Sequence, residues 1–281
     1  MLAFGGNLTA ANVLRYITGN FDNVLIGRVL GAGPLGIYTK SYGLLMLPIG
    51  QISGPMGSAL LPGLSRLQHN PGEYGRLFIR AFRTISFVTV PLVVFSFALA
   101  GDIVLVLLGR KWLGVGPVFQ LLAPAALFGA ISFAPGWLCQ SLGRARRQLH
   151  YALVAAPVCV AGFLIGIKWG IAGVALSYSI TVSLLFWFYV WYASKDSPVR
   201  FAEIVTCFLS ALGPALAAAL AAWVFRSYLP GNIVPFLALT VSGLIFCAIY
   251  LGAGMIVPKN RELILSGAIS VRRMVKRYRR G

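Results

Sequence analysis

Polar residues recur at helical spacing near the start of the chain, inside a stretch that is otherwise apolar. Asn12, Arg15, Asp22 and Asn23 fall at steps that place them on one face of an α-helix. The planar guanidinium of arginine binds phosphate oxygens in pairs. An ionisable residue at the centre of a membrane helix costs about 2.5–3.5 kcal/mol, so it usually faces a cavity or a partner. This face therefore predicts a polar cavity wall with Arg15 as its anion-binding group; a clamp of Arg15 with Asp22 or another helix is the alternative.

Further polar side chains in apolar segments are candidates for the same cavity, namely Lys40, Gln51 and Gln140. Each has a second interpretation. Lys40 flanks a glycine-proline turn and is suited to snorkelling toward lipid headgroups. Gln140, with its neighbour Trp137, either faces a sugar or packs between helices. Asp22 either titrates in a cation-coupled cycle or serves as a capping or pairing group.

A basic stripe follows the second apolar segment. Arg76, Arg80 and Arg83 stand at i, i+4 and i+7 after Pro71, which predicts one cationic face on a helix. We expect this stripe to meet anionic headgroups. Recruitment of an anionic substrate at the cytoplasmic mouth of a cavity is the alternative.

The elements that position these residues are predicted to be membrane helices. The chain is 58% hydrophobic and 11% charged, against about 25% charged residues in soluble domains. A membrane span needs about 20 mostly apolar residues, and helices satisfy their backbone hydrogen bonds internally. We therefore expect an all-α integral membrane protein with about eight transmembrane helices. The candidate segments are 4–29, 36–62, 84–108, 117–141, 150–167, 171–193, 204–225 and 233–257.

The net charge of +18 is distributed unevenly along the chain. If the spans alternate in direction, 17 of the 24 basic residues lie on one side, including those of a basic tail over 259–281. The positive-inside rule then places both termini in the cytoplasm. This placement accounts for the charge by topology and surface anchoring, so we expect no nucleic-acid partner.

The residue types give little support for a catalytic site or a metal site. Four cysteines stand singly in apolar segments, and neither histidine has ligand partners nearby in sequence, so no metal or cofactor site is expected. Six acidic residues are present, none paired within a span. General acid–base catalysis therefore has little to work with. We therefore expect a protein that is not an enzyme.

Several longer stretches resemble a known family. They are DNVLIGRVLGAGPLGIYTKSYGLLMLPIGQISGPMGSALLPGLSRLQ (22–68), LLGRKWLGVGPVFQLLAP (107–124), QSLGRARRQL (140–149) and WGIAGVALSYSI (169–180). In order and spacing they are similar to bacterial polysaccharide flippases, the O-antigen and exopolysaccharide-repeat exporters of the multidrug/oligosaccharidyl-lipid/polysaccharide superfamily. The resemblance covers about residues 5–193.

The resemblance implies a transporter of the bacterial inner membrane that flips undecaprenyl-diphosphate-linked glycans of lipopolysaccharide or exopolysaccharide by alternating access. It implies two six-helix bundles, of which this chain looks like the second. We therefore expect a six-helix bundle over 1–193, two additional helices over 194–258 and the basic tail. The implied partners are the lipid bilayer, the lipid-linked glycan and a missing amino-terminal half. A cation-coupled multidrug exporter, a membrane-bound glycan enzyme and a non-transporting truncated scaffold are the alternatives.

Overall fold

The computed structural model describes residues 2–229, 234–256 and 260–263, and this part of the chain holds helices and turns but no strand. The side chains of residues 2, 3 and 52–55 are outside the description. The helices are α1 (Leu2–Val29), α2 (Ala32–Arg66), α3 (Pro71–Ala98), α4 (Ala100–Leu107), η1 (Arg110–Trp112), α5 (Val115–Ile131), α6 (Phe133–Ser141), α7 (Ala145–Gly166), η2 (Ile167–Trp169), α8 (Gly170–Ser194), α9 (Phe201–Tyr228) and α10 (Pro235–Ile256).

The predicted class, an all-helical membrane protein, is confirmed, but the count of eight spans is not. Within the described residues, five helical segments are long and apolar enough to cross a membrane, or six if the bent halves of α2 form one span. Those halves meet at 49° across residues 52–55, where the sequence contains Pro55. One of the five segments, 145–194, contains both α7 and α8, which lie side by side. The polar helix α1 does not meet the hydropathy criterion.

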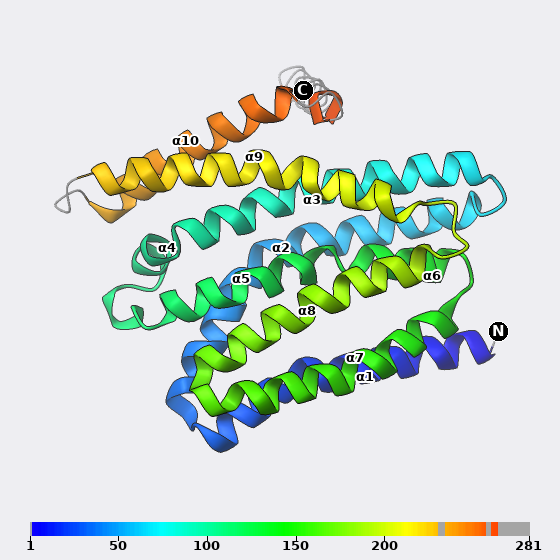
Figure 1. Ribbon diagram of the computed structural model, residues 1–281, viewed down its shortest axis with the longest axis horizontal. Helices are drawn as coiled ribbons and strands as arrows, with labels where there is room; N and C mark the ends of the chain where they lie inside the picture. Colours follow the sequence, from blue (N-terminus) through cyan, green and yellow to red (C-terminus); the bar gives the residue numbers. More distant parts are fainter. Residues whose placement is uncertain (1, 230–233, 257–259, 264–281) are drawn as a thin grey trace, which may run out of the picture.

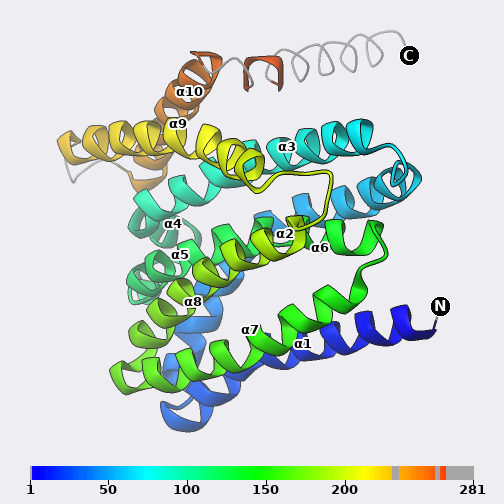
Figure 2. The ribbon, with the colours of Figure 1, turned by 45° about the vertical axis from the view of Figure 1, so that its right-hand side comes forward.

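The long helices run back and forth between two ends of the molecule (Figure 1). Helices α1 and α7 lie together along one side, α3, α9 and α10 lie along the other, and α2, α5 and α8 lie between them (Figures 1 and 2). The start of α1 and the loops before α3, α7 and α9 share one end. The predicted turns between α1 and α2 and between α7 and α8 are at the opposite end, where Gly31 and Gly170 adopt positive φ angles of 89° and 69°.

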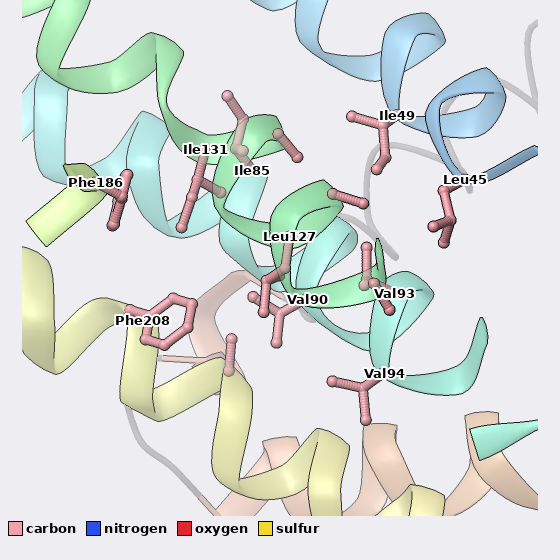
Figure 3. Close-up of a cluster of buried hydrophobic side chains, with 14 of the residues drawn as sticks. Leu45, Ile49, Ile85, Val90, Val93, Val94, Leu127, Ile131, Phe186 and Phe208 are labelled. Atoms are coloured by element: carbon pink, nitrogen blue, oxygen red, sulfur yellow. The ribbon is translucent and has the colours of Figure 1, made fainter. Parts of the chain in front are cut away.

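The core lies where α2, α3, α5, α8 and α9 meet, and it is made almost entirely of aliphatic and aromatic side chains (Figure 3). Leu127 of α5 lies between Val90 of α3 and Phe208 of α9 in this view. Phe208 also approaches Phe128, with ring centroids 5.6 Å apart. This packing joins α9 to the rest of the bundle.

Helices α7 and α8 approach unusually closely because glycines face each other across the hairpin. A Cβ atom added to Gly166 would collide with the Ser177 hydroxyl and with the backbone of Gly173. A Cβ added to Gly162, one turn earlier, would lie 2.8 Å from the Thr181 hydroxyl. Small residues four positions apart are a recurring feature of helix contacts in membranes. Here they bring the backbones of α7 and α8 close together near the turn that joins the two helices.

Candidate functional site

Two adjoining cavities share Arg15 and Phe133 in their walls. The larger has a volume of about 520 Å³ and lies among α1, α2, α5, α7 and α8. The smaller has about 330 Å³ and is bounded by α1, α2, α6 and α7. Both volumes fall within the range of about 300–1,000 Å³ that is usual for ligand pockets. Arg15 therefore stands at the junction of the two.

The guanidinium of Arg15 has no acidic neighbour in this wall. The residue is exposed, and no aspartate or glutamate lines either cavity. Its electrostatic neighbours are Tyr151 of α7 and Tyr189 of α8, whose rings stack with centroids 3.8 Å apart and planes 8° apart. A cation that has no counter-ion and faces a cavity is able to bind an anion without first breaking an ion pair.

Asp22 is placed differently from Arg15, although both belong to the predicted polar face. It is 5% exposed and lines neither cavity. Its Oδ2 atom accepts a hydrogen bond from the Tyr38 hydroxyl at 2.7 Å, and its Oδ1 atom accepts one from the Asn23 backbone N–H at 2.8 Å. Among the described residues Asp22 has no ion pair with Arg15. In the described part of the chain Asp22 is therefore paired with Tyr38 and the Asn23 backbone, away from the two cavities and from Arg15.

The larger cavity has a wall of aromatic side chains with hydroxyl groups. Tyr42 of α2 and Tyr178 of α8 have ring centroids 6.2 Å apart, and Phe163 lies 5.3 Å from Tyr178. Both tyrosines are in the electrostatic field of Asp22, which lies behind them. Aliphatic residues such as Ile49 and Leu185 complete the lining. This cavity therefore offers a mostly apolar surface with scattered hydroxyl groups.

The smaller cavity is lined mainly by uncharged polar groups. Gln140 and Gln148 are joined by a hydrogen bond of 3.3 Å between Nε2 of the first and Oε1 of the second. The indole of Trp137 lies against Gly57, where an added Cβ would be 3.2 Å from its Nε1 atom. Asn12 completes the polar wall that Arg15 begins. The structure therefore brings three predicted site residues together: Asn12, Arg15 and Gln140.

The other predicted cavity residues lie elsewhere. Lys40 is exposed, with its Nζ atom 5.8 Å from the centroid of the Trp112 ring, and this agrees with an interfacial position. Gln51 is exposed and lines neither cavity. Asn23 is half-buried, and its Oδ1 atom has no hydrogen-bond partner among the described residues. Helical spacing alone did not distinguish these side chains from Arg15.

The predicted basic stripe on α3 is split between two environments. Arg76 and Arg80 are exposed. Arg83 is partly buried against α9, with its Nη2 atom 4.0 Å from the Cys207 thiol and its Nε atom buried without a partner in the described part of the chain. The predicted tail, 259–281, lies outside the described residues except for 260–263.

Several residues around the cavities were absent from the sequence-based set. Tyr151, Tyr189 and Gln148 come from α7 and α8, more than a hundred residues after Arg15. A tyrosine in an apolar segment is equally typical of core packing, so no spacing rule would have selected them. Their role depends on the close α7–α8 contact.

Comparison with known proteins identifies proteins to which this chain is similar. Residues 1–117 match the model of a family described as "Polysaccharide biosynthesis protein". The chain is 26% identical over 180 residues to a membrane protein in the cps region of Klebsiella pneumoniae, covering 64% of this chain and 37% of that protein. It is 23% identical over 178 residues to the lipopolysaccharide biosynthesis protein WzxC of Escherichia coli K12, covering 63% and 36%. The predicted resemblance to polysaccharide flippases is confirmed.

A solved structure supports the fold independently of sequence. The lipid II flippase MurJ in its inward closed conformation superposes with a TM-score of 0.69 at 17% identity, covering 88% of this chain and 52% of MurJ. At that identity the match shows the fold alone. The chain spans less than two-fifths of the length of the first two curated relatives and about half of MurJ.

Proposed function

We propose that this chain forms part of the path by which a lipid-linked glycan diphosphate crosses the bacterial inner membrane. The cationic Arg15, open to two cavities and without an acidic neighbour in their walls, is the observation that carries the proposal. A diphosphate needs such a cation once it leaves bulk water, and arginine binds it through two parallel hydrogen bonds. The relatives named for polysaccharide and O-antigen biosynthesis support this class of cargo.

The orientation follows from the distribution of charge. The loops that precede α3, α7 and α9 lie at one end with the start of α1, and their flanks contain most of the described basic residues. By the positive-inside rule this end faces the cytoplasm. A lipid-linked substrate made in the cytoplasm would then enter from the end where Arg76 and Arg80 are exposed.

A complementary bundle is part of the proposal, because the matches cover only 37% and 36% of the two curated relatives and 52% of MurJ. The two bundles would enclose the cavities and rock about them, exposing Arg15 to each side of the membrane in turn. A multidrug exporter is the alternative within the superfamily. The cation at Arg15 disfavours cationic drugs in these cavities.

The test is restoration of surface polysaccharide in bacteria that lack their own flippase. The chain is co-expressed with the amino-terminal half of a polysaccharide flippase, and each variant is compared at equal membrane abundance. We expect the wild-type pair to restore polymer and Arg15→Ala to abolish it. Arg15→Lys should give partial restoration, because lysine keeps the charge but loses the paired hydrogen bonds.

Arg28→Ala is the matched control, since Arg28 is an exposed arginine on the same helix that lines neither cavity. Its pair should restore polymer as the wild type does. Full restoration by Arg15→Ala would contradict the proposal. A wild-type pair that is abundant in the membrane but restores no polymer would favour the non-transporting scaffold.

A further inference from the structure

The smaller cavity has a composition that the diphosphate does not require. Apart from Arg15, its polar wall is neutral: Asn12, Ser58, Trp137, Gln140 and Gln148. Phosphate recognition uses cations and backbone N–H groups, whereas neutral amides both donate and accept. The residues of this wall are therefore better matched to a neutral ligand that carries donors and acceptors of its own.

The two glutamines leave hydrogen-bonding capacity facing inward. One hydrogen bond joins their side chains, at 3.3 Å. Each amide has an oxygen acceptor and an NH₂ donor, so whichever way the two are turned, one acceptor and one donor group stay available. Gln148 is only 2% exposed, so its side chain is held in the wall rather than in bulk water. A ligand hydroxyl or acetamido group is able to bond with both the free acceptor and the free donor of the glutamine pair.

Trp137 and Gly57 shape the same wall. The indole lies so close to Gly57 that an added Cβ would be 3.2 Å from its Nε1 atom. Trp137 is 6% exposed, so it contributes an edge and not an open ring face. A side chain at position 57 would take space from the cavity.

We infer that the smaller cavity binds the first neutral sugar of the substrate, a pyranose with hydroxyl or acetamido groups, while Arg15 binds the attached phosphate. This inference rests on the proposed function and assigns the sugar and the phosphate of the substrate to different parts of the site. Arg15 is common to both cavities, so one end of the phosphate group meets the amide-lined cavity and the other meets the larger aromatic one. The order of the two cavities then follows the order of groups in a sugar phosphate attached to a lipid.

The experiment compares two soluble ligands on the full chain in lipid nanodiscs. Inorganic pyrophosphate reports on Arg15 alone, and N-acetylglucosamine 1-phosphate reports on Arg15 together with the sugar. Dissociation constants are measured by ligand-observed NMR. We expect the wild type to bind both ligands, and pyrophosphate serves as the anion-only reference.

The deciding variants are Gln140→Met and Gln148→Met, which keep side-chain length and remove the amide. Each should weaken binding of the sugar phosphate about fivefold or more, through loss of one hydrogen bond, and leave pyrophosphate binding unchanged. Gln120→Met is the matched control, because Gln120 donates to the Phe97 carbonyl at 3.1 Å and lines neither cavity. Gln140 is partly exposed, so its variant gives a result even if the buried Gln148→Met fails to fold.

Equal weakening of both ligands, or no change in either, would overturn the sugar subsite. Arg15→Ala separates this result from the proposed function, because it should weaken both ligands. If Arg15→Ala leaves pyrophosphate binding unchanged, the proposed function is contradicted whatever the glutamine variants do.

Discussion

Two arginines illustrate how differently the two sides of this bundle use charge. Arg226 of α9 donates from Nε and Nη2 to the two carboxylate oxygens of Asp102, at 2.9 and 3.0 Å, and ties α9 to α4. Arg15 of α1 has no such partner and faces two cavities. Arg226, on the side of α3, α9 and α10, is closed by an acidic partner within the protein. Arg15, on the side of α1, α7 and α8, forms no such pair among the described residues and is left open to the cavities.

The difference teaches that an arginine in a membrane helix is informative only together with the positions of the acids. Asp102 pairs with Arg226, Asp196 pairs with Arg147, and Asp22 is held by Tyr38. None of these carboxylates reaches Arg15. We propose that the charge of Arg15, which these carboxylates leave uncompensated, marks a place where an anionic ligand fits.

The largest expected effect concerns the close contact between α7 and α8, on the side of the bundle that contains Arg15. Gly166→Ala places a methyl group against the backbone of Gly173 and the Ser177 hydroxyl, so it should force α7 away from α8. We expect a loss of about 3 kcal/mol in unfolding free energy, at the upper end of overpacking effects. Gly213→Ala in α9 is the control, since a Cβ there meets nothing within 4 Å. It should stabilise the protein by up to about 1 kcal/mol.

Denaturant unfolding in detergent micelles measures both glycine variants. If Gly166→Ala is as stable as Gly213→Ala, the close α7–α8 contact does not contribute to the free energy of unfolding.

The second prediction concerns the buried carboxylate behind the cavity. Tyr38→Phe removes the hydroxyl that donates to Asp22 and leaves a buried oxygen without that partner. We expect a loss of about 2 kcal/mol, because an unsatisfied buried polar group costs about 1–3 kcal/mol. Tyr16→Phe is the control, since Tyr16 is 73% exposed on α1. Equal unfolding midpoints for the two variants would show that the Tyr38 hydrogen bond contributes nothing.

A smaller effect is expected for Arg226, the arginine that is paired with Asp102. Arg226→Ala should lower the unfolding free energy by about 1 kcal/mol, since the pair is partly exposed, with side-chain exposures of 29% for Arg226 and 15% for Asp102. It should leave pyrophosphate binding unchanged, because Arg226 lines neither cavity. Weakened pyrophosphate binding in Arg226→Ala would remove the distinction between the two arginines.

The smallest effect is a pH dependence at the loop that follows α8. The hydrogen bond from Arg147 lowers the pKa of the exposed Asp196 carboxyl. A lowered pKa in the folded state stabilises the fold above the unfolded value of about 3.9, and this contribution is lost as the pH falls below about 4. The difference in melting temperature between wild type and Asp196→Asn should therefore shrink between pH 7 and pH 3. A difference that is the same at both pH values would contradict this pairing.

The helices and turns could be predicted from sequence because their causes are local. Gly31 and Gly170 end helices through their own backbone conformation, and apolar runs mark the long helices. The count of eight spans was not confirmed, because among the described residues α1 is too polar, α2 is bent, and α7 and α8 form one continuous helical segment. The polar residues of α1 had indicated the site.

The partners of the polar residues could not be predicted, because they depend on packing between distant segments. Arg226 and Asp102 are 124 residues apart, and Tyr189 stacks on Tyr151 from a different helix. Helical spacing placed Asp22 with Arg15 on one face. Asp22 lies about two turns further along α1, where Tyr38 of α2 covers it, whereas Arg15 is left open.

The most direct test of the central claim is whether water reaches position 15 inside the membrane. Arg15→Cys and Leu216→Cys are made in a chain whose four native cysteines are replaced, and each is treated in membranes with a charged, water-soluble maleimide. Leu216 is 54% exposed near the middle of α9 and lines neither cavity, so it reports on the lipid-facing surface. We predict rapid labelling of Arg15→Cys and little labelling of Leu216→Cys. Equal labelling of the two positions, or none at position 15, would contradict the account.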